Sequence, residues 1–179
     1  IAVIIPSYNY GSFLVEAIES VLRQTRPADE ILISDDCSND NTQEIGEAYQ
    51  KKYPNLIRFN KNNKNLGIVK HFNKAVSLIK SDYICFLGAD NRFRSDYIEN
   101  TAEVLDSDDK IAIAYTDCAL FGSRASLLYN TVPSSQKGGI LEDVYYIVTF
   151  PDFTPKVSET MKMTNVMHGS SMYKRKAFL

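Results

Sequence analysis

Short apolar segments alternate with amphipathic segments over most of the chain, and no other feature limits the fold as strongly. Five segments of four or five residues are largely apolar, which is typical of strands buried on both faces of a parallel sheet. The segments between them carry apolar residues at helical spacing. This order predicts an α/β fold with a mostly parallel sheet and helices on both faces. The predicted strands are residues 1–5, 30–34, 56–59, 83–87 and 111–115.

Local signals set the expected ends of several elements. We expect Pro6 to end the first strand and Ser12 to cap the helix that follows it. Asp40 and Gln43 have the spacing of a capping box for the second helix. Ser95 is the expected N-cap of the fourth helix.

The pattern weakens after Leu120. Residues 122–139 are typical of a loop, because glycine and polar residues interrupt any period. Residues 141–150 have spacing that favours a helix, and residues 172–179 begin a further element. The expected organisation is therefore a well-patterned half, residues 1–120, followed by the start of a second half, residues 121–179.

Composition excludes several classes of protein. The chain has 179 residues, 44% of them hydrophobic, and a net charge of −2, which suits one ordinary globular domain and disfavours a generally basic nucleic-acid-binding protein. No apolar stretch reaches about 20 residues, so we expect no membrane-spanning helix. Three cysteines without metal-ligand spacing suit a reducing compartment. Because the chain begins at Ile1 and ends abruptly at Leu179, we expect a fragment whose fold is incomplete at the C-terminus.

The residues just after the strands are the candidate functional residues. In open parallel sheets, ligands bind at the carboxyl ends of the strands. Three polar groups occupy those positions, and two of them bring carboxylates to the same edge. They are Pro6-Ser7-Tyr8-Asn9, Asp35-Asp36-Cys37-Ser38 and Gly88-Ala89-Asp90-Asn91.

The common phosphate-binding loops are missing, which leaves a divalent cation as the natural means of holding a phosphate. The chain has neither G-x-G-x-x-G after its first strand nor a P-loop, so a dinucleotide oxidoreductase or P-loop enzyme is disfavoured. Carboxylates are good ligands for Mg²⁺ or Mn²⁺, and Asp90 follows a buried strand directly. Gly-Ala-Asp-Asn is equally good turn chemistry, so both interpretations stay open on spacing alone.

Four motifs in order resemble family 2 glycosyltransferases, which have the GT-A fold. The first group, Pro6–Asn9, with Ser20–Thr25 closing the following helix, resembles the opening of that family. Ile33–Asp40 is similar to its V-D-D-G-S-x-D segment, and Asn65-Leu66-Gly67 with Asn73-Lys74-Ala75 to its N-x-G…N-x-A stretch. Residues 83–91 stand where the family has its D-x-D loop, and a weaker match lies at residues 169–172.

The resemblance implies a function and a role for each residue. Members of the family transfer a sugar from a nucleotide-sugar, usually a uridine diphosphate (UDP) sugar, to an acceptor hydroxyl with inversion. By that likeness Pro6 offers its backbone to the base, Tyr8 packs against the ring, and Asp36 accepts the N3–H of uracil. A carboxylate only accepts hydrogen bonds, so it pairs with uracil but not with the N3 of cytosine. By the same likeness Asp90 holds the cation against both phosphates. Lys70 is expected to face the diphosphate because it lies one helical turn after Gly67.

Ser7 and Asn9 complete the expected donor-binding set. Turn and cap roles are the alternative for them, as for Asp35 and Asp40. The family's loop usually has acids where this chain has Gly88 and Asn91. One carboxylate still suffices for Mg²⁺, because that ion keeps several waters and takes oxygens from the diphosphate.

The catalytic base of the family lies after the segment that matches residues 169–172. We therefore expect the base beyond Leu179, and expect this fragment alone to be inactive in transfer. Asp117, Asp143, Glu159 and His168 are internal candidates, and His168 is the most interesting because it adjoins the expected acceptor loop.

The family's usual setting is bacterial envelope polysaccharide synthesis in the cytoplasm, at the inner face of the membrane. A glycan or lipid-linked glycan acceptor and peripheral membrane association are implied, and a nucleic-acid partner is not. Eight Lys or Arg residues and no acid lie between residues 51 and 80, which indicates either a solvated face or attraction of an anionic donor or leaflet. Two alternatives stay open: a non-catalytic nucleotide- or glycan-binding module of the same fold, and a sugar-1-phosphate nucleotidyltransferase.

Overall fold

The computed structural model describes residues 1–151 and 171–177, which divide into two compact units. One unit consists of Ile1–Ala114 with Met172–Leu179, and the other of Tyr115–Ser171. The expected halves, 1–120 and 121–179, were distinguished by their roles in binding, and that division stays a prediction.

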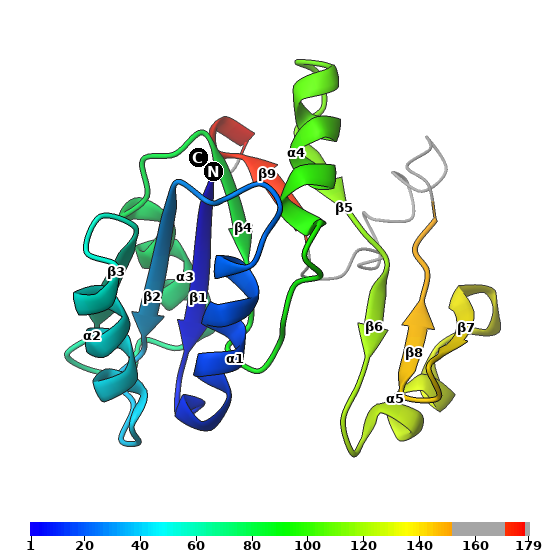
Figure 1. Cartoon of the computed structure of the whole chain (residues 1–179), viewed down its shortest axis with the longest axis horizontal. Helices are drawn as coiled ribbons and strands as arrows, with labels where there is room; N and C mark the ends of the chain where they lie inside the picture. The colour runs from blue at the N-terminus through cyan, green and yellow to red at the C-terminus, as the bar shows by residue number, and fades with distance from the viewer. Residues whose placement is uncertain (152–170, 178–179) are drawn as a thin grey trace. The chain divides into compact units, whose positions relative to one another are not determined.

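A six-stranded sheet forms the centre of the first unit. The strand order is β3-β2-β1-β4-β9-β5, and β1 pairs in parallel with both β2 and β4. The α/β class with a mostly parallel sheet is therefore confirmed (Figure 1). The strands are β1 (Ala2–Ser7), β2 (Glu30–Asp35), β3 (Ile57–Lys61), β4 (Tyr83–Phe86), β5 (Ile113–Tyr115) and β9 (Ser171–Lys174). The helices are α1 (Gly11–Leu22), α2 (Thr42–Lys52), α3 (Ile68–Ser77) and α4 (Tyr97–Ser107).

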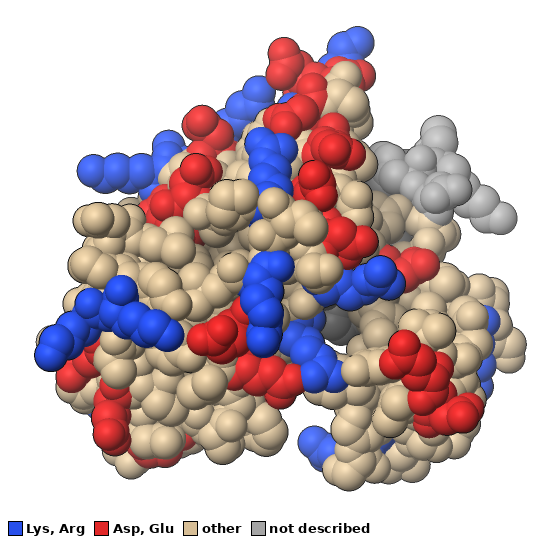
Figure 2. Space-filling view, in the orientation of Figure 1, with Lys and Arg blue, Asp and Glu red and all other residues tan. Residues whose placement is uncertain are grey.

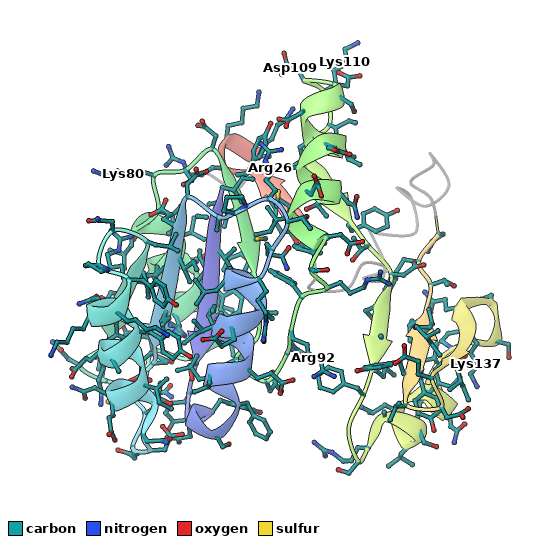
Figure 3. All side chains as sticks on the ribbon, viewed as in Figure 1. Arg26, Lys80, Arg92, Asp109, Lys110 and Lys137 are labelled. Carbon is teal, nitrogen blue, oxygen red and sulfur yellow. The ribbon has the colours of Figure 1, made fainter. Side chains whose placement is uncertain are left out.

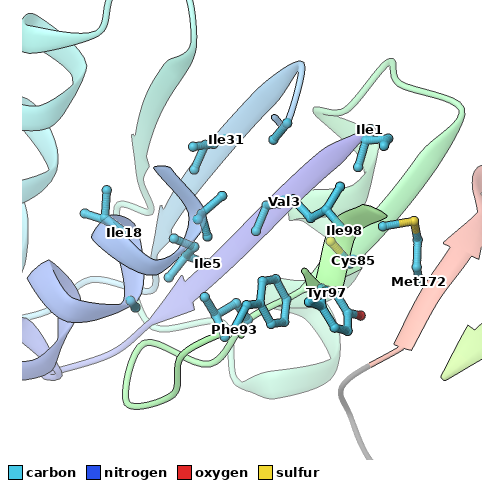
Figure 4. Close-up of a cluster of buried hydrophobic side chains, with 14 of the residues drawn as sticks. Ile1, Val3, Ile5, Ile18, Ile31, Cys85, Phe93, Tyr97, Ile98 and Met172 are labelled. Carbon is cyan, nitrogen blue, oxygen red and sulfur yellow. The ribbon is translucent and has the colours of Figure 1, made fainter. Parts of the chain in front are cut away.

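Alternate residues of the central strands supply two separate apolar layers. Val3 and Ile5 of β1 belong to a cluster with α1 and α4, which Figure 4 shows in close-up. Ala2 and Ile4 belong to a second cluster with α3 on the opposite face of the sheet. Burying an isoleucine side chain completely contributes about 1.5–3 kcal/mol. Strands buried on both faces explain why the predicted strand segments are nearly continuous apolar runs.

The first strand does not end at Pro6, contrary to expectation. β1 continues to Ser7, and Pro6 pairs in register with Ser34 of β2. The neighbouring β4 ladder ends at the pair Ile4–Phe86, so among the described residues no strand lies where the missing N–H of Pro6 would donate. A proline is tolerated in a strand at such a position.

Helix caps also differ from those expected. The N-cap of α1 is Tyr10, not Ser12, and the carboxylate of Asp40 accepts a hydrogen bond from the N–H of Gly11 at 2.8 Å. The same carboxylate accepts from the N–H of Thr42 at 3.0 Å, so one side chain caps both α1 and α2. The expected capping box does not form.

Two further cap residues have other positions. Gln43 donates to Glu47 instead of reaching back to Asp40. Ser95 precedes Asp96, which is the N-cap of α4 and makes no side-chain cap hydrogen bond.

Two predictions for the second unit were wrong. Residues 122–139 contain α5 (Ala125–Thr131) and a 3₁₀ turn (Ser134–Gln136), and residues 141–150 form no helix. Strands β7 (Lys137–Leu141) and β8 (Tyr145–Val148) instead form a hairpin beside β6 (Cys118–Leu120). The turn is made by Glu142 and Asp143, both with positive φ, which is the geometry of a tight hairpin turn.

Residues 172–179 were expected to begin another element, and β9 with the 3₁₀ turn Arg175–Ala177 is that element. β9 runs antiparallel to β4, with Met172 opposite Cys85. In the described part of the chain, no helix is long and apolar enough to cross a membrane.

Gly46 lets α2 pack closely against β3, which gives a test of this packing. A Cβ at residue 46 would lie 2.2 Å from Cδ2 of Phe59. We expect Gly46→Ala to lower the free energy of unfolding by about 1–3 kcal/mol, because overpacking outweighs the better helix propensity of alanine. Urea unfolding would measure this change. In a Phe59→Leu background the cost of Gly46→Ala should fall, and a stabilising Gly46→Ala in the parent would contradict the packing.

Candidate functional site

The carboxyl ends of three adjacent strands bring the sequence-predicted residues to one edge of the sheet. β1 lies between β2 and β4, and all three run in parallel. The loops that follow them contain Tyr8, Asp36 and Asp90 respectively. Neighbouring strands are about 4.8 Å apart, so the ends of β2 and β4 are separated by about 10 Å.

The loops after β1 and β2 are tied together by Asn9. Its backbone is left-handed (φ 59°), its N–H donates to the hydroxyl of Ser38 at 2.9 Å, and its side-chain oxygen accepts from the N–H of Asn39 at 2.8 Å. Asn9 therefore has a loop-forming role in the structure, and direct donor binding by Asn9 stays a prediction.

Asp35 supports its own loop from inside the protein. Its side chain is fully buried, and Oδ1 accepts hydrogen bonds from both the N–H and the hydroxyl of Ser38. The ammonium of Lys61 lies 3.9 Å from Oδ2. Cys37 follows in the left-handed region (φ 70°), where glycine is favoured. Its backbone conformation therefore costs free energy, and the hydrogen bonds of Asp35 stabilise the turn against that cost.

Asp36 is held by three hydrogen-bond donors from the loop that joins β3 to α3. Its Oδ1 accepts from Nδ2 of Asn62 at 2.8 Å and from the N–H of Leu66 at 2.9 Å, while Oδ2 accepts from the N–H of Gly67 at 3.0 Å. Burial alone would raise the pKa of this carboxyl, but these donors and the nearby His71 outweigh it. The pKa of Asp36 therefore lies below its ordinary value of 3.8, and the side chain is an anion at neutral pH.

His71 lies buried behind this loop, on α3. Its Nε2 is 2.8 Å from the hydroxyl of Ser34, and its side chain is 4% exposed. Burial lowers the pKa of His71 below its ordinary value of 6.5, even though the carboxylates of Asp36 and Asp35 act in the opposite direction. The histidine is therefore neutral at pH 7.

The three residues at the end of β1 differ in exposure. Tyr8 is 43% exposed at the edge of the sheet, as a residue that packs against a ligand ring must be. Pro6 is half-buried and Ser7 is buried, and within the described part of the chain the Ser7 hydroxyl has no hydrogen-bond partner. Whether these residues contact a donor stays a prediction.

Asp90 is exposed in the turn after β4. The N–H of Asn91 donates to the carbonyl of Gly88 at 2.9 Å, which closes the turn, and Nδ2 of Asn91 donates to Oδ1 of Asp90 at 3.1 Å. Both interpretations of Asp90 therefore remain compatible with its geometry. The next residue, Arg92, forms an ion pair with Glu16 of α1, which ties the segment after β4 to the helix (Figure 3).

Asp90 alone supplies too few ligands to bind a metal ion without a substrate. Among the described residues no group of three or more His, Cys, Asp or Glu side chains is placed to hold a metal ion. Asp90 suits a hard cation that takes its other oxygens from a diphosphate and water. The residues therefore fit a cation shared with a substrate, and they do not fit a site made by the protein alone.

Several of the basic residues between 51 and 80 already have protein partners. Arg58 pairs with Glu30 at 3.7 Å, Lys61 donates to Gln43 at 2.9 Å, and Lys74 donates to Asn62 at 2.6 Å. Lys70 is exposed on the first turn of α3. On the face shown in Figure 2, basic and acidic residues are interspersed.

The internal candidates for a catalytic base have structural roles where the structure describes them. Asp117 accepts a hydrogen bond from the N–H of Phe150 at 2.9 Å, and Asp143 is part of the β7–β8 turn. Glu159 and His168 lie outside the described residues.

Sequence reasoning missed the loop of residues 62–67 as part of the site. Asn62 is 2% exposed, and its amide contacts both Asp36 and Lys74. The available signal was Asn65-Leu66-Gly67, which we interpreted only as part of a family motif.

Comparison with known proteins identifies the family. The model described as glycosyl transferase family 2 matches residues 2–179. The chain belongs to this family. An uncharacterized glycosyltransferase of Mycoplasma pneumoniae is 33% identical over 78% of this chain and 46% of its own length. Chondroitin synthase of Escherichia coli is 29% identical over 73% of this chain and 19% of its own length.

Solved structures show the same GT-A fold. Residues 1–349 of TarS from S. aureus, in complex with UDP-GlcNAc, superpose with a TM-score of 0.70 at 22% identity over 97% of this chain and 45% of that one. The mannosyltransferase PcManGT from Pyrobaculum calidifontis, in complex with GDP-Man and Mn²⁺, gives 0.60 at 18% identity over 83% and 44%. The chain spans less than half the length of each of these four proteins.

The depressed pKa of His71 predicts a pH dependence of stability. As pH falls below about 6.5, the unfolded chain binds a proton that buried His71 resists, so the free energy of unfolding falls by at most about 1.4 kcal/mol per pH unit. His71→Gln keeps a neutral group beside Ser34 and should flatten this slope between pH 7 and pH 5. Urea unfolding at several pH values measures it, and an unchanged slope would show that His71 does not titrate with folding.

Proposed function

We propose that the protein transfers a sugar from a UDP-sugar to an acceptor hydroxyl with inversion at the anomeric carbon. The observation that carries this proposal is the Asp36 carboxylate, which three donors hold ionised after the end of β2, next in the sheet to β1, which Tyr8 follows. Family membership supports the transferase activity and disfavours the nucleotidyltransferase alternative.

Asp36 supplies base selectivity in this proposal. A carboxylate that is an anion over the physiological pH range accepts the N3–H of uracil, whereas the N3 of cytosine is itself an acceptor and would be repelled. Tyr8 packs against the ring, and Pro6 offers its backbone to the base. Guanine also carries an N–H donor, and the mannosyltransferase PcManGT was solved with GDP-Man, so guanosine diphosphate (GDP) belongs among the ligands to be compared.

The sheet geometry supports one ligand across two strand ends. The ends of β2 and β4 are about 10 Å apart, with β1 and Tyr8 between them. A base at Asp36 therefore extends through its ribose toward a diphosphate at Asp90. Lys70, on the first turn of α3, is proposed to add positive charge near that diphosphate.

Asp90 would hold a Mg²⁺ or Mn²⁺ ion. Such an ion neutralises the diphosphate as it becomes the leaving group. The protein's own contribution at this point is to fix the carboxylate in the turn closed by Gly88 and Asn91, and to brace that turn through Arg92 and Glu16.

Inverting transfer also needs a base that removes the proton of the acceptor hydroxyl. We expect this base beyond Leu179 and the acceptor to be a glycan or lipid-linked glycan, as the resemblance implies. A cytoplasmic location at the inner face of the membrane is likewise an expectation from the family. A non-catalytic binding module would share the nucleotide site but lack the base.

Base selectivity can be tested by substituting Asp36. We expect Asp36→Asn to lower the ratio of UDP affinity to cytidine diphosphate (CDP) affinity by about tenfold or more, because an amide NH₂ competes for the acceptor position. Calorimetry with UDP, CDP and GDP measures the ratio. Glu44→Gln, the same chemical change on the exposed face of α2, is the control and should leave the ratio unchanged. Equal losses for UDP and CDP would contradict base recognition by Asp36.

The cation site predicts a metal-dependent part of UDP binding. Asp90→Asn should abolish the gain in UDP affinity that Mn²⁺ gives the parent protein, while metal-free UDP binding stays the same. Gly88→Asp should increase that gain, because it adds a second carboxylate near Asp90. The new Cβ can be accommodated, since it would meet only the movable side-chain ends of Asn91, at 2.7 Å, and of Asp90, at 3.0 Å. Calorimetry with and without Mn²⁺ decides this, and a full Mn²⁺ effect in Asp90→Asn would exclude Asp90 as the ligand.

A further inference from the structure

Asn62 bridges two charged side chains from different parts of the first unit. Its Nδ2 donates to Oδ1 of Asp36 at 2.8 Å, and its Oδ1 accepts from Nζ of Lys74 at 2.6 Å. The amide is 2% exposed, so these contacts are made away from bulk water. Its own N–H donates to the carbonyl of Asp35 at 2.8 Å, which fixes the backbone at the end of β3 as well.

The chemistry of the two partners allows the amide only one orientation. An ionised carboxylate accepts hydrogen bonds and cannot donate, whereas an ammonium donates and cannot accept. The amide must therefore turn its NH₂ toward Asp36 and its oxygen toward Lys74. Lys74 thus holds the oxygen end of Asn62 and keeps the NH₂ directed at the carboxylate, although Lys74 does not itself contact Asp36 in any hydrogen bond of the described residues.

The same hydrogen bonds determine which oxygen of Asp36 is available to a ligand. A carboxylate oxygen has two acceptor positions. Asn62 and Leu66 occupy both positions on Oδ1, whereas Gly67 occupies one position on Oδ2. One acceptor position is therefore left, and it is on Oδ2.

We propose that Asn62, oriented by Lys74, is a positioning residue that sets the nucleobase selectivity of the site, by saturating Oδ1 of Asp36 and leaving Oδ2 as the single acceptor for a base N–H. This inference rests on the proposed function, since it specifies how Asp36 distinguishes uracil from cytosine. Lys74 acts on selectivity through Asn62, and Lys70, one turn earlier on α3, has no part in it.

The test is the ratio of UDP affinity to CDP affinity, measured by calorimetry on the protein and its variants. The two ligands carry the same diphosphate, so a general change in phosphate attraction cancels in the ratio. Lys74→Met should lower the ratio about threefold to tenfold, because the oxygen of Asn62 loses the ammonium that holds the amide in place and its hydrogen bond to Oδ1 of Asp36 weakens. Lys74→Arg should restore the ratio. Asn62→Leu should lower the ratio about tenfold or more.

Two further readouts separate positioning from a merely structural role. Lys64→Met removes the same charge from an exposed residue of the same loop and should leave the ratio unchanged. Asn62→Leu should also move the acid limb of UDP binding to higher pH, because the Asp36 carboxylate loses a donor that keeps its pKa low.

The possible results distinguish failure of the positioning role from failure of the proposed function. If the parent protein prefers UDP and the Lys74 and Asn62 variants weaken UDP and CDP equally, or if Lys64→Met lowers the ratio as much as Lys74→Met, the positioning role is wrong and the proposed function stands. If the parent protein shows no preference for UDP over CDP, the proposed base recognition and this inference both fail.

Discussion

Three hydrogen bonds to the carboxylate of Asp36 are the interaction on which the rest of the site depends. They join the end of β2 to the loop of residues 62–67, which leads directly into α3 and begins 26 residues after Asp36 in the sequence. Burying an anion costs several kcal/mol unless donors compensate it, so the carboxylate and the loop hold each other in place. Removal of any donor both loosens the loop and makes the carboxylate easier to protonate.

The sheet gives this interaction its position. Because β1 is buried on both faces and lies between β2 and β4, the three loops at its carboxyl edge have fixed separations. Asp40 adds to this order by capping α1 and α2 with one carboxylate. The positions of the polar side chains at the edge are therefore determined by the packing of the buried apolar residues in the strands. In this way the residues of the core specify the geometry of the binding site.

Features that depend on local sequence patterns could be predicted from the sequence. Five strand segments and the edge residues Tyr8, Asp36 and Asp90 followed from apolar runs, from the switch to polar residues after each run, and from a family resemblance. β9 was recognised only as an element, because its place beside β4 depends on the pairing of Met172 with Cys85, across more than eighty residues. Long-range pairing leaves no signal in a segment of four residues.

Other errors have similar causes. Residues 141–150, which hold the hairpin turn and β8, were interpreted as a helix because the turn uses Glu142 and Asp143 with positive φ, where glycine or asparagine is the usual signal. Ser12 was the expected cap of α1 because it is a good cap residue close in sequence. The residue that caps α1 is Asp40, which reaches the N–H of Gly11 from another loop and is 29 residues away in sequence. The role of Asn62 depends on two partners at once, and neither partner is near it in sequence.

In the proposed site Asp36 binds the base and Asp90 binds the cation on the diphosphate of the same nucleotide, after two strands that are separated by β1. A crystal structure of the protein with UDP and Mn²⁺ tests this most directly. We expect the N3 of uracil about 2.7–3.2 Å from Oδ2 of Asp36, with the ring against Tyr8 and the metal ion on the carboxylate of Asp90. A uracil ring bound away from Asp36, with Oδ2 still bonded only to Gly67, would contradict it.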